Sequence, residues 1–530
     1  MRRLFTFFIV ALFAQVVFAG GILTNSNQSA QFVRMLSRNA SLQIDGVYFN
    51  PAGLVMLEDG LHFSVSNQTI FQSRTINSGF SYLNEKEYKG EVFAPVFPDV
   101  YAVYKNKKWA FSAGFGPNGG GGSAKYNTGL PSFEKQIAAI PSSLTTNGIP
   151  TTKYSTDIQF EGESVFYGTQ LNASYAISDK ISLSAGVRML NAKNKYSGYL
   201  KDIMINPNYP AFGTSYTGNM VSAPKFFTDG ETFLKGLASS ATSAANSLSG
   251  MIGNGTLPAA APLTALPAAN QTAIAQLLGA AGISTTGMNV GTAVATLNAT
   301  SPIFTAKANV MKDNSTGTAN KEVDTEQLGT GFTPIIGFNI SLEKLNIGLK
   351  YEFQTNLILT NATKVDGTGL FKNNEKSHSD IPAILAAGAD YLITDAFKIS
   401  GSYNMYFDKN VNWGQNVYNQ ERLIDNNYIE LALGIEYHLS DRFALSGGFL
   451  NSNTGVSEQY QSDFSYSNDS STGAFGLEYK IGKKLTFDAG VMLTKYKDAN
   501  KEFTSGTTGY SETYGKATTG FAIGISYSIF

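Results

Sequence analysis

Apolar and polar residues alternate along many short segments of the chain, and residues 428–440 show the pattern most clearly. The odd-numbered positions from Ile429 to Leu439 are isoleucine, leucine or tyrosine, whereas the even-numbered positions between them are Glu, Ala, Gly and His. Successive side chains of a β-strand point to opposite faces, so this pattern predicts a strand with one apolar face. The alternation recurs in residues 181–189, 397–407, 485–493 and 521–529.

From Leu61 onward, alternating segments predict about fourteen strands, an even number as bacterial barrels require. Short polar turns such as residues 178–180 and 440–442 join some pairs, and long polar connections such as 408–425 and 451–471 join others. Short turns on one side and long loops on the other are typical of outer-membrane barrels. The predicted strand centres are Val65, Val100, Ser112, Thr169, Val187, Ile336, Leu349, Ala386, Ser402, Leu433, Ser446, Phe475, Ala489 and Ile523.

Composition favours a membrane barrel over a soluble fold. Only 15% of the residues are charged, against about a quarter in an average soluble protein, and the chain holds 36 Phe, 27 Tyr and 53 Gly. No later segment has the roughly twenty unbroken apolar residues of a helical span. A closed barrel satisfies every backbone polar group in lipid without such helices. We therefore expect an all-β fold, a transmembrane antiparallel β-barrel in the outer membrane.

The chain begins with two arginines after Met1, followed by an apolar run from Leu4 to Phe18 and then Ala19. A basic start, an apolar run and a small residue at the cleavage site predict a secretory signal peptide, residues 1–19. The alternative is a transmembrane anchor. The run is too short for a comfortable span, and no stop-transfer charges follow it.

Residue counts exclude several kinds of site. The chain has no cysteine and only three histidines, His62, His378 and His438, which are far apart in sequence. Disulfides, thiolate metal sites and cysteine nucleophiles are therefore excluded. We expect no cofactor, no metal and no enzymatic activity, since nucleophilic catalysis needs a partnered base that no motif here supplies. The net charge of −1 gives no indication of a nucleic-acid partner.

One long region, from about residue 200 to residue 322, does not follow the strand pattern. Within it, residues 236–306 carry no charged side chain and are rich in Ala, Leu, Ser, Thr and Gly. The stretches Phe233–Leu248 and Ala269–Ala280 predict short helices. Two interpretations of this extracellular insertion remain open: an apolar region that shelters a ligand or acts as a lid, and a surface subdomain packed on itself.

The segment between the signal peptide and the first strand, residues 20–57, resembles the N-terminal hatch of the FadL-type transporters of fatty acids and hydrocarbons. Its most specific mark is the triplet Asn50, Pro51 and Ala52, followed by Gly-Leu and the first strand. The resemblance extends through most of the predicted barrel. Arg34 and Arg38 depart from it, because better-known members have more Gly and Ala there. Further matching stretches are Gly21-Ile22-Leu23-Thr24-Asn25, Gln28-Ser29-Ala30 and Asn39-Ala40-Ser41.

The resemblance implies a monomeric barrel, residues 58–530, plugged by the hatch. It implies passive uptake of long-chain fatty acids or other hydrophobic small molecules. The ligand would be captured by apolar loops, held near the hatch and released sideways into outer-membrane lipid. In the family, the triplet corresponding to Asn50, Pro51 and Ala52 holds the hatch against a kinked strand. Taken alone, Asn-Pro is also a common turn former.

A lateral exit needs a strand that fails to pair locally, and the end of the third predicted strand has suitable residues. Gly114, Gly116 and Pro117 lie there, followed by four glycines at residues 119–122. Proline lacks the ladder donor, and glycine often marks a bulge. The resemblance places the family's wall opening in this strand, so these three residues are the gate candidates. The alternative is a flexible extracellular loop, which the four-glycine run favours.

The carboxylate of a fatty acid would be stabilised by a cation. Arg188 lies on the predicted lumen face of the fifth strand, with Lys193 farther along, and an arginine can bind a carboxylate through two parallel hydrogen bonds. Arg188 and Lys193 are therefore the candidate carboxylate ligands. The alternative for Arg188 is a structural ion pair with Glu430 or Glu436.

Other functions share parts of this pattern. A general or substrate-selective porin for polar solutes has the same alternation but lacks the hatch motif. A structural or adhesive outer-membrane barrel also remains open. An outer-membrane lipase would need a Ser/His motif, and an energised receptor would need a plug larger than residues 20–57.

Overall fold

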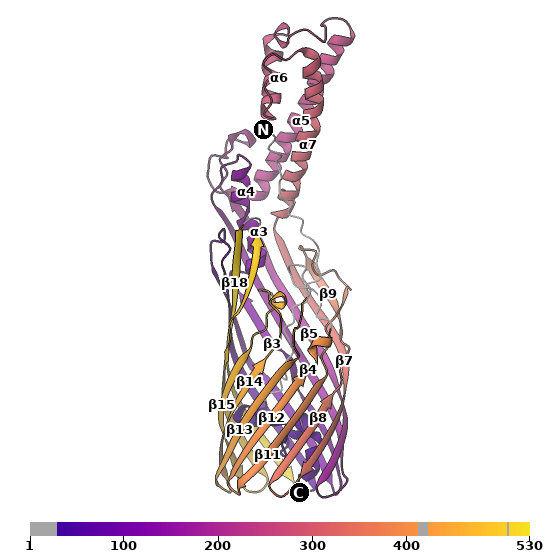
Figure 1. Ribbon diagram of the computed structural model, residues 1–530, viewed down its shortest axis with the longest axis vertical. Coiled ribbons are helices and arrows are strands. Elements are labelled where there is room, and N and C mark those ends of the chain that lie inside the picture. The colour runs from indigo at the N-terminus through magenta and orange to yellow at the C-terminus, as the bar shows by residue number, and fades with distance from the viewer. Residues whose placement is uncertain (1–28, 412–421, 506–507) are drawn as a thin grey trace. The chain divides into compact units, whose positions relative to one another are not determined.

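The computed structural model of the chain describes residues 29–411, 422–505 and 508–530 (Figure 1). The predicted signal peptide, residues 1–19, and the first part of the predicted hatch, residues 20–28, lie outside the described residues. The described chain divides into two compact units. One comprises residues 29–135, 158–199 and 321–530, and the other comprises residues 136–157 and 200–320.

The first unit is a closed antiparallel barrel of fourteen strands, counted over the described residues. Strand β1 pairs with both β2 and β18, which closes the sheet. Three barrel strands are each divided in two, as β8 and β9, β10 and β11, and β16 and β17, and the two-residue β6 extends the pairing of β5. The strands are β1 (Gly60–Ser78), β2 (Glu87–Asn106), β3 (Trp109–Tyr126), β4 (Tyr154–Ala176), β5 (Ile181–Ile205), β6 (Val221–Ser222), β7 (Lys321–Ser341), β8 (Leu345–Glu352), β9 (Ile358–Asp366), β10 (Lys376–His378), β11 (Ile384–Thr394), β12 (Phe397–Tyr406), β13 (Tyr428–Ser440), β14 (Phe443–Asn453), β15 (Ser470–Ile481), β16 (Leu485–Tyr496), β17 (Ala499–Ser505) and β18 (Thr508–Ile529).

The faces of the strands follow the sequence alternation. In β13, the side chains of Leu431 and Leu433 are 56% and 69% exposed. Ala432 and Glu436 lie on the opposite face of the same strand and are only 5% and 2% exposed. Large apolar side chains therefore cover the outer surface that faces lipid, and small or polar side chains face the lumen. Each predicted strand centre lies in a different barrel strand, so the predicted barrel is confirmed.

A helical N-terminal segment, residues 29–57, lies inside the barrel. It consists of α1 (Ala30–Arg34), α2 (Gly46–Phe49) and the 3-10 helix η1 (Pro51–Met56). Glycines on the lumen faces of β13, β14 and β16 leave room for it. A β-carbon on Gly434, Gly448 or Gly490 would lie 2.6–2.7 Å from an atom of this segment, closer than real β-carbons approach their neighbours.

Two connections between barrel strands contain short 3-10 helices. The connection between β14 and β15 contains η5 (Glu458–Tyr460), and its residues 460–468 are all buried. We call residues 454–469 the inward loop. Phe464 of this loop contacts Phe160 of β4 and Tyr196 of β5, with ring centres 5.1 and 5.6 Å apart. The short η4 (Asp408–Asn410) follows β12.

The second unit is mainly helical and corresponds largely to the predicted insertion. Its long helices are α5 (Ala223–Gly253), α6 (Ala268–Ala280) and α7 (Val290–Gly317), of which α7 was not predicted and α5 is longer than expected. Leu248, Leu278 and Leu297 are buried in one cluster, so the unit packs on itself. No helix of the described residues combines the length and apolar character needed to cross a bilayer. The remaining elements are α3 (Pro131–Ala138), which bridges the two units in sequence, α4 (Ile140–Thr146), η2 (Pro210–Phe212) and η3 (Leu263–Ala265).

Candidate functional site

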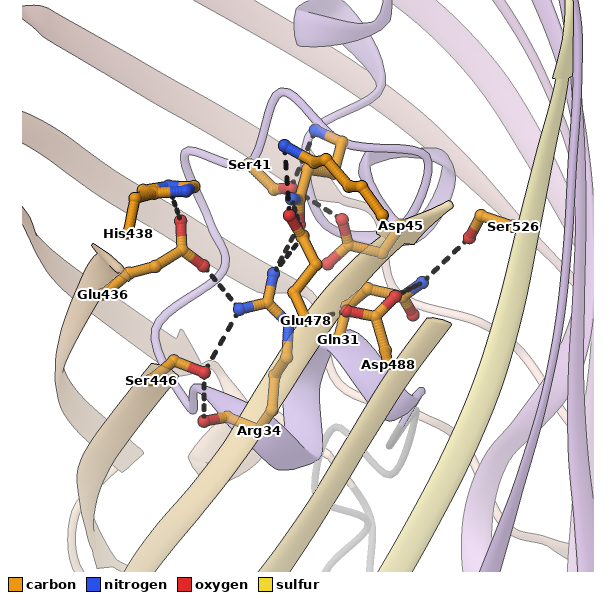
Figure 2. Close-up of polar contacts among 12 residues, drawn as sticks. Gln31, Arg34, Ser41, Asp45, Glu436, His438, Ser446, Glu478, Asp488 and Ser526 are labelled. Atoms are coloured by element: carbon orange, nitrogen blue, oxygen red, sulfur yellow. Dashed lines mark hydrogen bonds and ion pairs between the residues drawn. The ribbon is translucent and has the colours of Figure 1, made fainter. Parts of the chain in front are cut away.

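Arg34, at the end of α1, fixes the N-terminal segment to the barrel wall (Figure 2). Its guanidinium forms ion pairs with Glu436 of β13, Glu478 of β15 and Asp488 of β16, at 2.5, 2.8 and 2.8 Å. All four side chains are at most 3% exposed. Gln31 donates a hydrogen bond to Asp488 at 3.1 Å. One buried arginine therefore ties α1 to strands that lie more than four hundred residues away in sequence.

Arg38 stabilises the turn between α1 and α2 through contacts within the N-terminal segment. Its Nε and Nη2 donate to the two oxygens of Asp45 at 2.6 and 2.8 Å, and Ser41 donates to the same carboxylate at 2.6 Å. Burial opposes the charged form of Arg38, but the pKa of this guanidinium is still raised because Asp45 is in direct contact. The two arginines that depart from the family pattern are thus both internal anchors.

The predicted triplet contacts three barrel strands. Asn50 donates to Asn339 of β7 at 2.8 Å. The backbone oxygens of Pro51 and Ala52 accept hydrogen bonds from Ser174 of β4 and Ser182 of β5, at 2.7 and 2.6 Å. The 3-10 helix that begins at Pro51 also lies against β3, and the role of the triplet in holding the hatch against the third strand stays a prediction.

The third strand meets the N-terminal segment at Gly114. A β-carbon on Gly114 would lie 2.9 Å from Cγ1 of Val47, so only glycine leaves room for this contact. The backbone oxygen of Val47 accepts hydrogen bonds from Gln170 and Asn172 of β4, at 2.9 and 3.2 Å. The first gate candidate therefore lies directly beside α2.

The ladder between β2 and β3 is interrupted beyond this contact. The two strands pair from Asn106↔Trp109 to Val100↔Phe115 and resume only at Val92↔Ala124. Residues 116–123 of β3, which include Gly116 and Pro117, pair only with β4, and that pairing has irregularities after Pro117 and after Gly120. The barrel wall thus lacks continuous hydrogen bonding at the predicted gate.

A cavity of about 320 Å³ occupies the lumen next to this interruption. Phe32 and Phe49 of the N-terminal segment line it, as do Ala94 and Phe97 of β2 and Gly122 of β3. Tyr466 of the inward loop is a further lining residue. The volume lies within the range of about 300–1,000 Å³ that ligand pockets usually have.

The two carboxylate candidates are not brought together. Arg188 is buried on the lumen face of β5, where it binds Glu352 at 2.6 Å through Nη1 and Gln170 at 2.6 Å through Nη2. The alternative, an ion pair of Arg188 with Glu430 or Glu436, is wrong because Arg188 pairs with Glu352 instead. Lys193 lies an odd number of residues farther along and is exposed on the outer face, where it pairs with Glu326 at 3.0 Å. Neither candidate lines the cavity.

Comparison with known proteins adds to this geometry. A family profile described as "Outer membrane protein beta-barrel domain" matches residues 371–528. A FadL homologue of Pseudomonas aeruginosa is similar in structure, with a TM-score of 0.57 and 12% identity over 97% of this chain and 100% of that chain. The chain is an outer-membrane β-barrel of FadL-like fold.

Two toluene transporters also align with the FadL-like barrel, each over 92% of this chain and 94% of theirs. TodX of P. putida has a TM-score of 0.48 at 12% identity, and TbuX of Ralstonia pickettii has 0.47 at 15%. A search of curated proteins by sequence finds no match.

Two residues of the wall interruption in the FadL-like barrel, Pro95 and Pro98 of β2, were not predicted from the sequence. Both lie in the stretch of β2 that does not pair with β3. The backbone oxygen of Pro95 accepts hydrogen bonds from the side chains of Asn67 and Thr69 in β1, at 3.2 and 2.9 Å. A proline cannot donate to a strand ladder, so two prolines in one predicted strand were a signal that could have located the interruption.

Proposed function

We propose that the FadL-like barrel carries hydrophobic small molecules, long-chain fatty acids among them, passively across the outer membrane. One observation carries the proposal. The cavity of about 320 Å³ is lined by residues of β2 and β3 at the stretch where these strands do not pair, and by the N-terminal segment. The cavity, the obstruction of the lumen and the interruption of the wall therefore meet at one place.

The physical chemistry favours a sideways exit. The N-terminal segment is buried and bonded to the wall through Arg34 and Asn50, so a straight route through the lumen is obstructed. Each CH₂ group that leaves water for lipid gains about 0.8 kcal/mol. A ligand that leaves between β2 and β3 enters lipid without crossing the polar lumen. We assign Gly114, Gly116 and Pro117 to the lateral gate. We assign the triplet of Asn50, Pro51 and Ala52 to the contacts that hold the N-terminal segment in the lumen.

The exit can be tested by filling the interruption from β2. Ala94 is half-buried and lines the cavity, whereas Val96 in the same stretch is 68% exposed on the outer surface. We expect Ala94→Trp to reduce uptake of radiolabelled oleate by cells carrying the protein nearly to background. Val96→Trp, which adds the same bulk outside, should leave uptake unchanged. Equal uptake by both variants would exclude an exit at this place.

The alternative function, a porin for polar solutes, can be tested by liposome swelling. Liposomes that contain the full chain should not swell in small sugars, because the N-terminal segment obstructs the lumen. Rapid swelling of the wild-type protein would contradict the plugged barrel and favour diffusion of polar solutes.

A further inference from the structure

Two cations face each other inside the cavity. Arg74 of β1 and Lys516 of β18 are direct cross-strand partners, and both line the cavity. The guanidinium of Arg74 lies 4.4 Å from the ring centre of Tyr466, and Nζ of Lys516 lies 5.5 Å from the same ring and 5.1 Å from that of Tyr496. Like charges directly opposite each other in a sheet are destabilising, so this pair needs a compensating interaction.

Three other buried lumen cations have carboxylate partners. Arg34 binds Glu478 at 2.8 Å, and Arg188 and Lys350 both bind Glu352 at 2.6 Å. Among the described residues, Arg74 and Lys516 form no ion pair, and Nε of Arg74 is buried without a hydrogen-bond partner. Tyr466 forms a side-chain hydrogen bond with Arg74, and the rings of Tyr466 and Tyr496 lie beside the two cations, but neither tyrosine supplies a carboxylate.

The carboxylates of the cavity do not compensate this pair. Glu430 lines the cavity but accepts hydrogen bonds from Asn404, Tyr406 and Tyr428, at 3.0, 3.0 and 2.7 Å. Glu163 lies on β4, which is a neighbour of neither β1 nor β18. The positive charge of the pair is therefore open to an anion that enters the cavity.

We propose that Arg74 and Lys516 bind the carboxylate of an amphiphilic ligand whose acyl chain occupies the apolar part of the cavity. Phe97, Phe160 and Phe464 line that part. A carboxylate would accept charge-assisted hydrogen bonds from both cations and offset their repulsion. The inference rests on the proposed function and narrows its ligand class, because a neutral hydrocarbon gains nothing from this pair.

The test compares two ligands of equal chain length, oleate and oleyl alcohol, for binding to the purified full-length protein. The variants are Arg74→Gln and Lys516→Gln. The matched control is Lys495→Gln, because Lys495 pairs with Ala517, next to Lys516, but lies on the outer face of β16. Each lumen variant should weaken oleate binding about 10- to 100-fold, since hydrogen bonds to charged groups are the strong ones. Oleyl alcohol binding should not change, and the control should bind both ligands as the wild type does.

A second measurement separates binding from folding. Removing one of two facing cations relieves repulsion, so the ligand-free lumen variants should unfold at the wild-type temperature or above it. Lys516→Glu places a carboxylate opposite Arg74, and it should raise the unfolding temperature further and abolish the preference for oleate.

The outcomes are distinguishable from those of the proposed function. If the lumen variants lose both ligands equally, or keep wild-type oleate binding, the carboxylate site is refuted. If the wild type binds both ligands equally well, the carboxylate site is refuted while the proposed function stands. If the wild type binds neither ligand, the proposed function itself fails.

Discussion

Arg34 of α1 and Glu478 of β15 form an ion pair of 2.8 Å in which neither side chain is more than 3% exposed. Glu436 and Asp488 contact the same guanidinium, so one arginine faces three carboxylates. Lys398 also pairs with Glu436, at 3.0 Å. Burial of so many charges is tolerable only because each is paired, which makes the position of α1 depend on Arg34.

Replacement of Arg34 by methionine should therefore release the N-terminal segment. Removing one partner of a buried ion pair typically costs about 3–5 kcal/mol, because the remaining charges stay buried without compensation. We expect faster amide hydrogen exchange in residues 29–40 and swelling of variant liposomes in small sugars. Arg442→Met, at an exposed position in the turn between β13 and β14, should change neither. Wild-type exchange in Arg34→Met would show that other contacts hold the segment.

Gly114→Val should displace α2 from the third strand. The added side chain would overlap Val47, and overpacking of this kind costs about 1–3 kcal/mol. We expect faster hydrogen exchange in residues 46–56 and an altered rate of oleate uptake. Gly473→Val in β15 is the control, because a β-carbon there meets no atom within 4 Å. If both variants exchange alike, the contact between Gly114 and Val47 does not hold α2 in place.

The barrel itself could be predicted because lipid imposes a local rule. Every second residue of a spanning strand must be apolar, so the sequence alone indicates which residues face lipid and which face the lumen. Leu433 and its neighbour Ala432, which are 69% and 5% exposed, follow this rule. The same rule separates Arg188 from Lys193, which lie an odd number of residues apart and so face opposite sides of β5. Applied strictly, alternation would have removed Lys193 from the candidate carboxylate ligands.

The lumen contacts could not be predicted, because they join distant parts of the chain. Nothing near Arg34 in sequence indicates Glu478, and nothing near Arg74 indicates Lys516, which becomes its neighbour only when the barrel closes between β1 and β18. Helix α7 was missed for a different reason. Its buried residues Ala293, Leu297 and Thr300 have helical spacing, but a high content of Thr and Ala, with Pro302 inside the helix, obscured the pattern.

The inward loop should respond to pH through Asp463. Burial raises the pKa of Asp463 to about 6, with a further contribution from nearby Glu512 that Lys135 partly offsets. In the unfolded chain an aspartate titrates near pH 3.9, roughly, so the folded state binds the proton more tightly. The stability of the inward loop should therefore fall as the pH rises from the unfolded-state pKa to the folded-state pKa of Asp463. Above the folded-state pKa it should fall no further.

We expect residues 460–468 to show greater hydrogen-exchange protection at pH 5 than at pH 8, after correction for the intrinsic rate. Asp463→Asn should remove most of this difference while keeping an acceptor for the backbone N–H of Ser132, which donates at 2.6 Å. Asp469→Asn, in the same loop, should retain the difference. A pH dependence that survives in Asp463→Asn would assign it to another group.

The helical unit should unfold separately from the barrel, because its apolar side chains pack on one another. Leu297 of α7 is fully buried among Leu248, Leu278 and their neighbours, whereas Ile303 of the same helix is 47% exposed. Leu297→Ala should destabilise the helical unit by about 2–5 kcal/mol, the usual cost of such a cavity, and Ile303→Ala should have little effect. Thermal unfolding followed by the circular dichroism of helices should show an earlier transition only in Leu297→Ala. The barrel should keep its wild-type transition, since no residue of its wall changes, and a single shared transition that shifts as a whole would show that the two units fold together.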